Sequence, residues 1–284
     1  MRNWLENEYV ILSGASGGIG RELCKILIEK YHANVIGIGR SEEKMLSLIQ
    51  ELGENASRFS YRLFDVGVKE NWQSFKNNLI EQNILPRLLI NNAGAFPTFC
   101  KTLNTPSETA ERIIRNNYLS IVYAVEAIAP ILVGSPTNKK GKCKDLPAIV
   151  NIASAASLCS VVGTSAYSAS KGAVKGYSEA LQMEEKGKKY IGIIYPGTTA
   201  TDLFRSDKKT DNSALYYIAM PAKKMAKKIA RKILKKRKRA VVGWDAKLMN
   251  WTAKLMPVKG LAIISGVMKA SKSKVFTDVF DYEK

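Results

Sequence analysis

The chain has 284 residues and a net charge of +19, and its hydrophobic and charged fractions of 46% and 24% are ordinary for a globular protein. This length can bury the core of one large domain or of two small ones. A single histidine and four cysteines without C-x-x-C spacing argue against a zinc dehydrogenase, a structural metal site and a Ser-His-Asp hydrolase. Acid–base chemistry must therefore use Tyr, Lys, Asp or Glu.

The N-terminus and the apolar runs bear on location. Residues 1–14 contain no long apolar stretch and include Glu6 and Glu8, so we predict no signal peptide. The longest candidate for a membrane span, residues 255–268, is short and interrupted by Lys259. We read the cysteines as reduced thiols and predict a cytoplasmic protein, with peripheral contact at a membrane surface left open.

Short apolar runs alternate with amphipathic runs along the chain. The predicted strands are 9–13, 34–38, 59–64, 87–91, 148–153, 190–195 and 240–244. The predicted helices are 18–30, 41–52 with Ser41 as N-cap, 71–83, 107–132 and 166–186. Apolar strands alternating with helices form a parallel sheet covered on both faces, so we predict an α/β fold of the Rossmann-type doubly wound class.

A glycine-rich turn, SGASGGIG at residues 13–20, follows the first strand and opens the first helix. Gly14, Gly18 and Gly20 lack Cβ atoms, so the pyrophosphate of a dinucleotide could approach the backbone and meet the helix N-terminus. A tight strand–helix turn alone has the same composition. The preceding strand and following helix supply the context that the dinucleotide motif requires.

Arg40 follows the second strand, and Gly39 stands where NAD-binding proteins place an acid for the ribose 2′-hydroxyl. A guanidinium would pair with a 2′-phosphate, so this position favours NADP(H) over NAD(H). The alternative is a solvated arginine before a helix. Asp65 ends the third strand, where the adenine ring is expected.

Tyr167 and Lys171 are four residues apart and share a face of a predicted helix. A free phenol has a pKa of about 10, and a nearby cation favours its deprotonation. The pair therefore suits a general acid that protonates a carbonyl oxygen, although the same spacing often decorates a helix surface. Ser154, at the end of the preceding strand, could hold the substrate oxygen beside Tyr167.

Together these motifs resemble the short-chain dehydrogenase/reductase family over roughly residues 8–245. The resemblance is carried by seven motifs in order: SGASGGIG, Asp65-Val66, NNAG at 91–94, Asn117, Ser154, YSASK at 167–171 and PGTTAT at 196–201. Ser13 replaces the family's usual threonine but keeps the hydroxyl. Ala153 stands where a second serine is frequent.

The resemblance implies a catalytic set of four residues. Tyr167 would be the acid/base, and Lys171 would lower its pKa and bind the nicotinamide ribose. Ser154 would orient the substrate oxygen. Asn117 would support a water in the proton relay, and its neighbour Asn116 fits the family pattern less well.

The resemblance also implies a cofactor site, a sheet order of 3-2-1-4-5-6-7, and a homodimer or homotetramer formed through the helices at 107–132 and 166–186. Asn91, with Ala93 and Gly94, would stabilise the sheet and line the cofactor cleft. The implied NADP(H)-binding residues are Gly14, Ser16, Gly18, Ile19, Gly20, Arg40, Asp65, Val66, Asn92, Ala93, Gly94, Tyr167, Lys171, Pro196, Gly197, Thr199 and Thr201.

Two later segments are less typical of the family. Residues 202–220 fall where the family keeps its substrate lid, and their apolar and aromatic side chains favour a hydrophobic substrate, or pack the lid onto the body. Residues 223–239 contain eleven lysines and arginines and no acid. They predict a helix with an apolar face on the sheet and a basic face that is solvated or attracted to anionic lipid. No nucleic-acid-reading motif accompanies them, so no nucleic-acid partner is expected.

The chain continues beyond the last predicted strand. We therefore predict a single NADP(H)-binding catalytic domain at 1–245 and a C-terminal helical extension at 246–284. This extension resembles the tails of the hydroxysteroid-dehydrogenase-like reductases, and could pack at a dimer interface, close over the substrate or lie on a membrane.

The sequence as a whole predicts an NADP(H)-dependent oxidoreductase acting on a hydrophobic ketone or alcohol, steroid-like or lipid-derived. Two alternatives remain: a 3-oxoacyl-[acyl-carrier-protein] reductase, for which the basic helix is suited, and a membrane-associated NADP(H)-binding scaffold without enzymatic activity.

Overall fold

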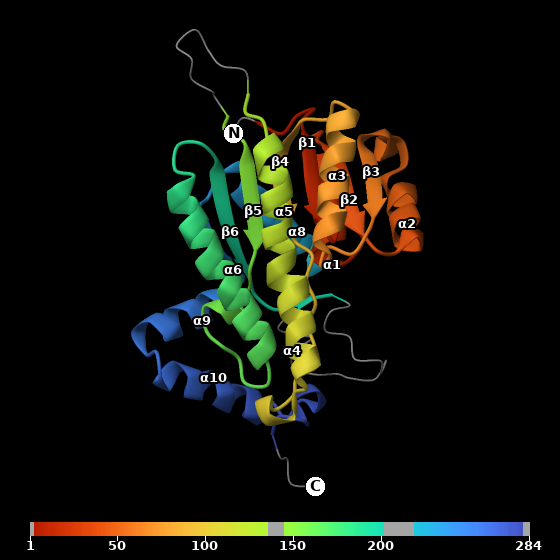
Figure 1. Ribbon diagram of the computed structural model, residues 1–284. Coiled ribbons are helices and arrows are strands. Elements are labelled where there is room, and N and C mark those ends of the chain that lie inside the picture. The colour runs from red at the N-terminus through yellow and green to blue at the C-terminus, as the bar shows by residue number, and fades with distance from the viewer. Residues whose placement is uncertain (1–2, 136–144, 202–218, 281–284) are drawn as a thin grey trace.

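The computed structural model describes residues 3–135, 145–201 and 219–280. Seven strands form one sheet with helices on both faces (Figure 1). They are β1 (Tyr9–Ser13), β2 (Asn34–Gly39), β3 (Phe59–Leu63), β4 (Pro86–Asn91), β5 (Ala148–Ile152), β6 (Tyr190–Pro196) and β9 (Arg239–Val242). The order is β3-β2-β1-β4-β5-β6-β9 and every neighbouring pair is parallel, which confirms the predicted fold class and strand order.

Alternation along the strands divides the apolar core in two. In β1, Val10 and Leu12 pack with the helices on one face, whereas Ile11 packs with those on the other. The central strands are buried along their whole length, which is the reason for their continuous apolar runs.

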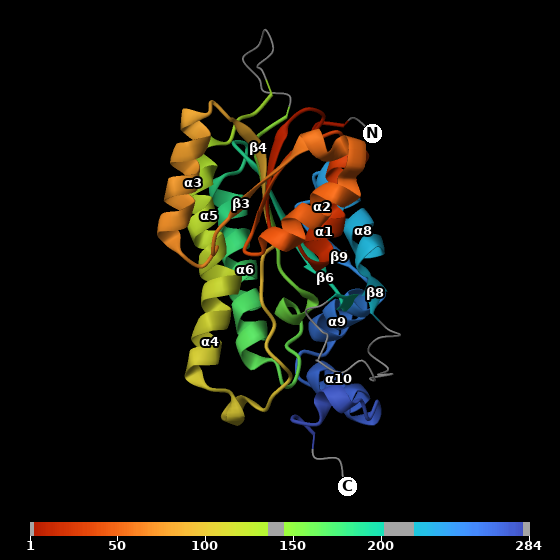
Figure 2. The same ribbon diagram turned by 90° about the vertical axis from the view of Figure 1, so that its right-hand side faces the viewer.

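One face of the sheet is covered by α1 (Gly18–Glu29), α2 (Glu42–Leu52) and α8 (Ala222–Leu234), and the other by α3 (Lys69–Glu81), α5 (Ser120–Ile128) and α6 (Ser165–Glu184) (Figure 2). Ser41 caps α2 as predicted, because its hydroxyl accepts a hydrogen bond from the Lys44 amide. The apolar side of α8 is buried against the sheet and α1, as its pattern predicted, and most of its lysines are exposed.

The predicted helix at 107–132 is not continuous, and this prediction is corrected. It consists of α4 (Ser107–Ile114), a π-helical turn η3 (Arg115–Leu119), α5 and a 3₁₀ turn η4 (Ala129–Ile131). The wider turn contains Asn117, whose buried amide bonds to the backbone of Ala95 rather than facing solvent. Such π turns often mark functional sites. The basic helix predicted at 223–239 is also corrected: α8 ends at Leu234, Lys236 has a positive φ, and β9 begins at Arg239. The other predicted strands and helices match within two residues at each end.

Beyond β9 the chain forms α9 (Trp244–Leu255), α10 (Lys259–Ala270) and a 3₁₀ turn η7 (Lys274–Phe276), which lie below the sheet in Figure 1. Shorter elements are the 3₁₀ turns η1 (Gly53–Arg58), η2 (Thr102–Asn104) and η5 (Ala155–Ser157), and a small parallel pair, β7 (Thr199–Ala200) with β8 (Met220–Pro221). The predicted lid at 202–220 lies, except for its last two residues, outside the described residues.

No helix within the described ranges has the length and apolar character needed to cross a membrane. Residues 255–268 are divided between the end of α9 and α10.

Candidate active site

A cavity of about 540 Å³ opens at the carboxyl ends of the strands. This is the edge where parallel α/β sheets bind their ligands, and the volume is in the range of cofactor and substrate sites. Most of the predicted site residues line it. They are Gly14, Ser16, Gly18, Ile19, Arg40, Asp65, Val66, Asn92, Ala93, Gly94, Ser154, Tyr167, Lys171, Pro196, Gly197, Thr199 and Thr201.

The glycine turn is built without space for side chains. Gly14 has φ of +69°, and a Cβ there would lie 3.0 Å from the Ala93 Cα atom. A Cβ on Gly20 would overlap the Gly14 carbonyl oxygen, so Gly20 acts behind the cavity wall by letting α1 begin close to the turn. Glycine is therefore required at both positions, and the backbone between them stays accessible.

The Ser13 hydroxyl joins the ends of β1 and β4. It accepts hydrogen bonds from the amides of Asn92 and Ala93, each at 3.0 Å. The Asn92 side chain donates back to the Ser13 carbonyl at 3.1 Å. A serine hydroxyl thus suffices at this position. In the sheet itself, the Asn91 amide donates to Asn151 at 2.8 Å, which joins β4 to β5.

Two cations stand at the far end of this part of the cavity, Arg40 after β2 and Lys44 in the first turn of α2. Position 39, where an NAD-binding protein would carry an acid, is a glycine. A Cβ atom there would lie 2.6 Å from the Met45 Cε atom and 3.0 Å from the Ser16 hydroxyl. The sequence reading missed Lys44. Its position four residues after Arg40 was the signal, because the first turn of a helix brings such a residue back toward its start.

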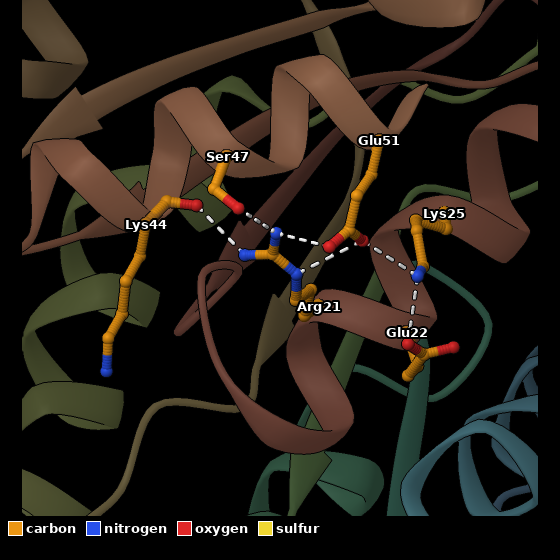
Figure 3. A network of polar contacts seen from close by, with 6 residues as sticks. All are labelled: Arg21, Glu22, Lys25, Lys44, Ser47 and Glu51. Carbon is orange, nitrogen blue, oxygen red and sulfur yellow. Dashed lines mark hydrogen bonds and ion pairs between the residues drawn. The ribbon is translucent and has the colours of Figure 1, made fainter. Parts of the chain in front are cut away.

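A polar network holds α1 and α2 together beside these cations (Figure 3). The Arg21 guanidinium donates to the Lys44 carbonyl at 2.9 Å, to the Ser47 hydroxyl and to the Glu51 carboxylate. Lys25 also pairs with Glu51, at 2.9 Å. Hydrogen bonds from Arg21 and Lys25 lower the pKa of Glu51 to about 2. The helix that begins at the glycine turn is thereby tied to the helix that carries Lys44.

Ser154 and Tyr167 meet in the cavity, from the loop after β5 and the first turn of α6, and the Ser154 hydroxyl acts to lower the pKa of Tyr167. Lys171 lies one turn further along α6 and is 4% exposed. Its ammonium donates to the Ile152 carbonyl at 3.0 Å and lies 6.0 Å from the centroid of the Tyr167 ring. The helical spacing read from the sequence therefore brings Tyr167 and Lys171 to one place, and the loop after β5 adds Ser154.

Burial dominates the ionisation of this pair. It raises the pKa of Tyr167, and only the hydrogen bond with Ser154 acts in the opposite direction. It lowers the pKa of Lys171 to about 8. The expected lowering of the Tyr167 pKa by Lys171 is not seen in this structure, in which the ammonium is directed to the Ile152 carbonyl and is itself desolvated. Tyr167 is a neutral phenol near neutral pH.

Asn117 does not line the cavity, whereas Asn116 does. Asn117 is fully buried, accepts from the Ala95 amide at 2.6 Å and donates to the Ser170 hydroxyl at 3.0 Å. Gly94 lies between it and Lys171, since a Cβ there would be 3.1 Å from Asn117 Oδ1 and 3.4 Å from Lys171 Nζ. Asn117 thus holds the π turn against the cavity wall from behind.

The segment after β6 completes the polar half of the cavity. Thr201 covers Gly18, whose Cβ would lie 3.0 Å from the Thr201 methyl group. The Asp245 carboxylate, in the first turn of α9, accepts a hydrogen bond from the Thr198 amide. Helix α9, which leads into the C-terminal extension, is therefore joined directly to this segment.

The remaining wall is apolar and includes the C-terminal extension. Phe96 packs edge-on against Tyr167 with ring centroids 4.9 Å apart, and Phe99 packs in the same way against Phe96 and Phe276. Apolar wall residues that the sequence reading missed are Phe96, Phe99, Val161, Met249, Ile264, Met268 and Phe276. Phe96 and Phe99 lie a few residues after the NNAG motif and could have been found from it, whereas no local pattern signals the others.

Comparisons with known proteins agree with this arrangement. The family model described as short chain dehydrogenase matches residues 8–212. An NADPH-dependent pterin aldehyde reductase of Arabidopsis thaliana is 29% identical over 215 residues, which are 75% of this chain and 83% of the relative. A benzil reductase of Saccharomyces cerevisiae, named IRC24 and described as forming (S)-benzoin, is 28% identical over 207 residues, 71% of this chain and 75% of the relative.

A short chain dehydrogenase of Shigella flexneri, crystallised with NADP, has the same fold. The TM-score is 0.73 at 22% identity, and the match covers 87% of this chain and all of that one. The fold, the ordered motifs and the match to the family model over most of the chain lead to one conclusion. The chain belongs to the short-chain dehydrogenase family.

Proposed function

We propose that this protein is an NADP(H)-dependent oxidoreductase that interconverts a hydrophobic ketone and its alcohol. The observation that carries the proposal is one cavity lined by the glycine turn, by Arg40 and Lys44, and by Ser154, Tyr167 and Lys171. NADP(H) would supply or accept the hydride when bound there. The relatives' names, an NADPH-dependent reductase among them, agree with this reaction class.

The cavity fits a phosphorylated dinucleotide at two places. The glycine turn leaves open backbone at the N-terminus of α1, which suits a pyrophosphate. Arg40 and Lys44 then offer two positive charges where a 2′-phosphate would lie, with no acid at Gly39 to repel it. These features favour NADP(H) over NAD(H).

Tyr167 serves as the proton donor during carbonyl reduction. Because burial raises its pKa, the phenol holds its proton at neutral pH and can pass it to the substrate oxygen as that oxygen gains charge. The Ser154 hydroxyl orients the same oxygen. Giving up this proton leaves Tyr167 as a phenolate, and in the reverse direction the phenolate takes the proton of the alcohol back.

Asn117 acts as a positioning residue. Its bonds to Ala95 and Ser170 join the π turn η3, the loop after β4 and helix α6. The geometry of Lys171 beside Gly94 depends on these three elements. The family resemblance also implies that this asparagine supports a water in the proton relay, and we include that role in the proposal.

The substrate is proposed to be bulky and apolar. The rings of Phe96, Phe99 and Phe276 and the side chain of Met268 form the wall beyond Tyr167. Such a wall gains free energy by burying apolar surface and offers few partners to a charged substrate. The extension, residues 246–284, is thus proposed to be a functional part of the catalytic domain 1–245.

The test is NADPH oxidation over a panel of small aldehydes, acyl thioesters and bulky ketones, with NADH and Tyr167→Phe as controls. We expect turnover concentrated on bulky apolar ketones, weak with NADH and lost in the variant. Tight NADPH binding without turnover of any substrate in the panel would contradict the proposed reductase activity and support a cofactor-binding scaffold.

A second candidate, a 3-oxoacyl-[acyl-carrier-protein] reductase, is favoured by one observation. The exposed lysines of α8 would suit an acidic carrier protein. Activity on carrier-linked substrates far above that on free ketones would replace the first proposal with this one. A homodimer or homotetramer through α4, α5 and α6 stays a prediction, and the molar mass in solution tests it.

A further inference from the structure

The extension turns a row of large apolar side chains to solvent. In α9 these side chains recur at four- and three-residue steps, which places them on one side of the helix. Trp251, Leu255 and Val258 are 55%, 60% and 80% exposed. The α9–α10 outer face consists of Trp244, Leu248, Trp251, Leu255, Val258, Leu261, Ile263 and Val267. Exposed apolar side chains gathered in this way mark an interaction surface.

The charges on this surface are of one sign. Between Trp244 and Lys272 the only acid is Asp245, and its carboxylate turns inward to the Thr198 amide. The cations of the same stretch are all exposed: Lys247, Lys254, Lys259, Lys269 and Lys272. The surface is therefore apolar and cationic at once.

Helix α8 adds further positive charge beside it. Figure 2 shows α8, α9 and α10 following one another down the same side of the molecule. The apolar residues of α8 are buried, so its lysines and arginines point away from the sheet. Within the described part of the chain, Lys236 alone of residues 223–239 forms an ion pair, with Asp145. The other cations are available to an anionic partner.

We propose that the α9–α10 outer face, together with the basic side of α8, adsorbs to the surface of an anionic lipid bilayer. Tryptophan and leucine on one side of a helix with lysines around them is the composition of an interfacial helix. Lysines near such a surface are attracted by its negative potential. Adsorption to an anionic bilayer thus accounts both for the exposed apolar row and for the absence of exposed acids between Trp244 and Lys272.

A second copy of this chain is a poorer occupant. A two-fold interface places the same patch of both copies face to face, so these five lysines of each copy would be gathered in one interface with no acid of the α9–α10 outer face to pair with them. Like charges brought together in this way disfavour association. An acidic bilayer removes the conflict.

The inner side of the same two helices lines the substrate cavity through Met249, Ile264 and Met268. The α9 and α10 backbones pack closely where Gly260 meets Thr252, since a Cβ at Gly260 would lie 2.9 Å from the Thr252 carbonyl oxygen. One thin helical layer thus separates the cavity from the proposed bilayer. This consequence, which rests on the proposed function, makes a membrane-dissolved ketone the natural substrate class.

The test is co-sedimentation of the full chain with vesicles of phosphatidylcholine alone and of an equimolar mixture with phosphatidylglycerol. We expect binding to the mixed vesicles only, weakened by added salt. Trp251→Glu with Leu255→Glu should lower the partition coefficient by about tenfold or more, because two apolar anchors become anions. Lys247→Gln with Lys254→Gln and Lys259→Gln should lower it by roughly tenfold as well.

Leu85→Glu is the matched control. Leu85 is 56% exposed and directly precedes β4, at the opposite end of the strands from α9 and α10. This variant should bind the mixed vesicles as the parent does. Thermal unfolding of each variant and its NADPH-dependent turnover of a small water-soluble ketone separate folding and catalysis from adsorption.

Failure of the parent to bind the mixed vesicles, equal binding to neutral ones, or a glutamate variant that binds undiminished would overturn the proposal. So would a homodimer that the Trp251 and Leu255 changes dissociate. Loss of vesicle binding with retained turnover would support adsorption. Vesicle binding without any ketone turnover would leave adsorption in place and contradict the proposed function instead.

Discussion

The two halves of the cavity are built in different ways. The polar half is formed by short motifs at the ends of consecutive strands, such as the glycine turn and Arg40. The apolar half joins segments far apart in the chain, for example Phe99 with Phe276 at 4.9 Å between ring centroids. The polar half therefore serves a chemistry shared by a family, whereas the apolar half can change without disturbing it.

Tyr167 stands between these halves, and its change has the largest expected effect. Tyr167→Phe removes the proposed proton donor but keeps the ring that packs on Phe96. We expect kcat to fall by about 10³-fold, within the usual range for a general acid, with the Kd for NADPH within about twofold of the parent. Stopped-flow and fluorescence titration measure the two. A variant that kept most of its turnover would remove Tyr167 from the mechanism.

Changes at Arg40 and Lys44 test the polar half alone. Arg40→Gln with Lys44→Gln should raise the KM for NADPH by about 10- to 100-fold, because one or two charge-assisted bonds to a phosphate are lost. The KM for NADH and the ranking of ketone substrates should stay the same. Arg62→Gln, at a half-buried arginine of the edge strand β3, is the control. An equal effect on both cofactors would indicate damage to the fold.

Phe276→Ala tests the apolar half. Phe276 is 1% exposed and packs against Phe99, so the change opens the cavity wall. We expect KM for a bulky apolar ketone to rise by about tenfold, and the melting temperature to fall, since a buried phenylalanine is lost. KM for NADPH and kcat for a small aldehyde should change little. A uniform loss for all substrates would contradict the division into two halves.

The smallest expected effect is on stability. The pKa of Lys171 is about 8 in the folded protein, below its ordinary value of 10.5. Between these two pH values the folded, cofactor-free protein therefore binds fewer protons than the unfolded chain. The cost of holding the charge is full below pH 8 and is relieved as the pH rises from 8 toward 10.5. Stability should therefore increase between pH 8 and pH 9.5.

Lys171→Met should flatten this slope. At pH 7 we expect the variant to be more stable by about 1–2 kcal/mol, because the relief of desolvation exceeds the lost bond to the Ile152 carbonyl. It should have little turnover. Urea denaturation at several pH values measures the effect. Lys175→Met is the control, at a half-buried lysine one turn further along α6 that pairs with Glu179. A destabilised variant at pH 7 would contradict the desolvation of Lys171.

Much of the fold was readable from the sequence because its signals are local. Alternating apolar runs predicted all seven strands of the main sheet within two residues at each end. Ser41 and the glycine turn predicted the starts of α2 and α1. These patterns depend on periodicity and capping, which act over a few residues. The order of the strands followed from the family resemblance rather than from any pattern.

Only the tertiary structure decided the ionisation and the far wall of the site. The i, i+4 spacing of Tyr167 and Lys171 predicted their shared face, but burial of both groups set the direction of their pKa changes. The π turn at Asn117 depends on its bonds to Ala95, more than twenty residues away in the chain. Phe276 and Met268 reach the cavity because α10 and η7 fold back across it. Burial and long-range packing are properties of the assembled chain, so no local pattern contains them.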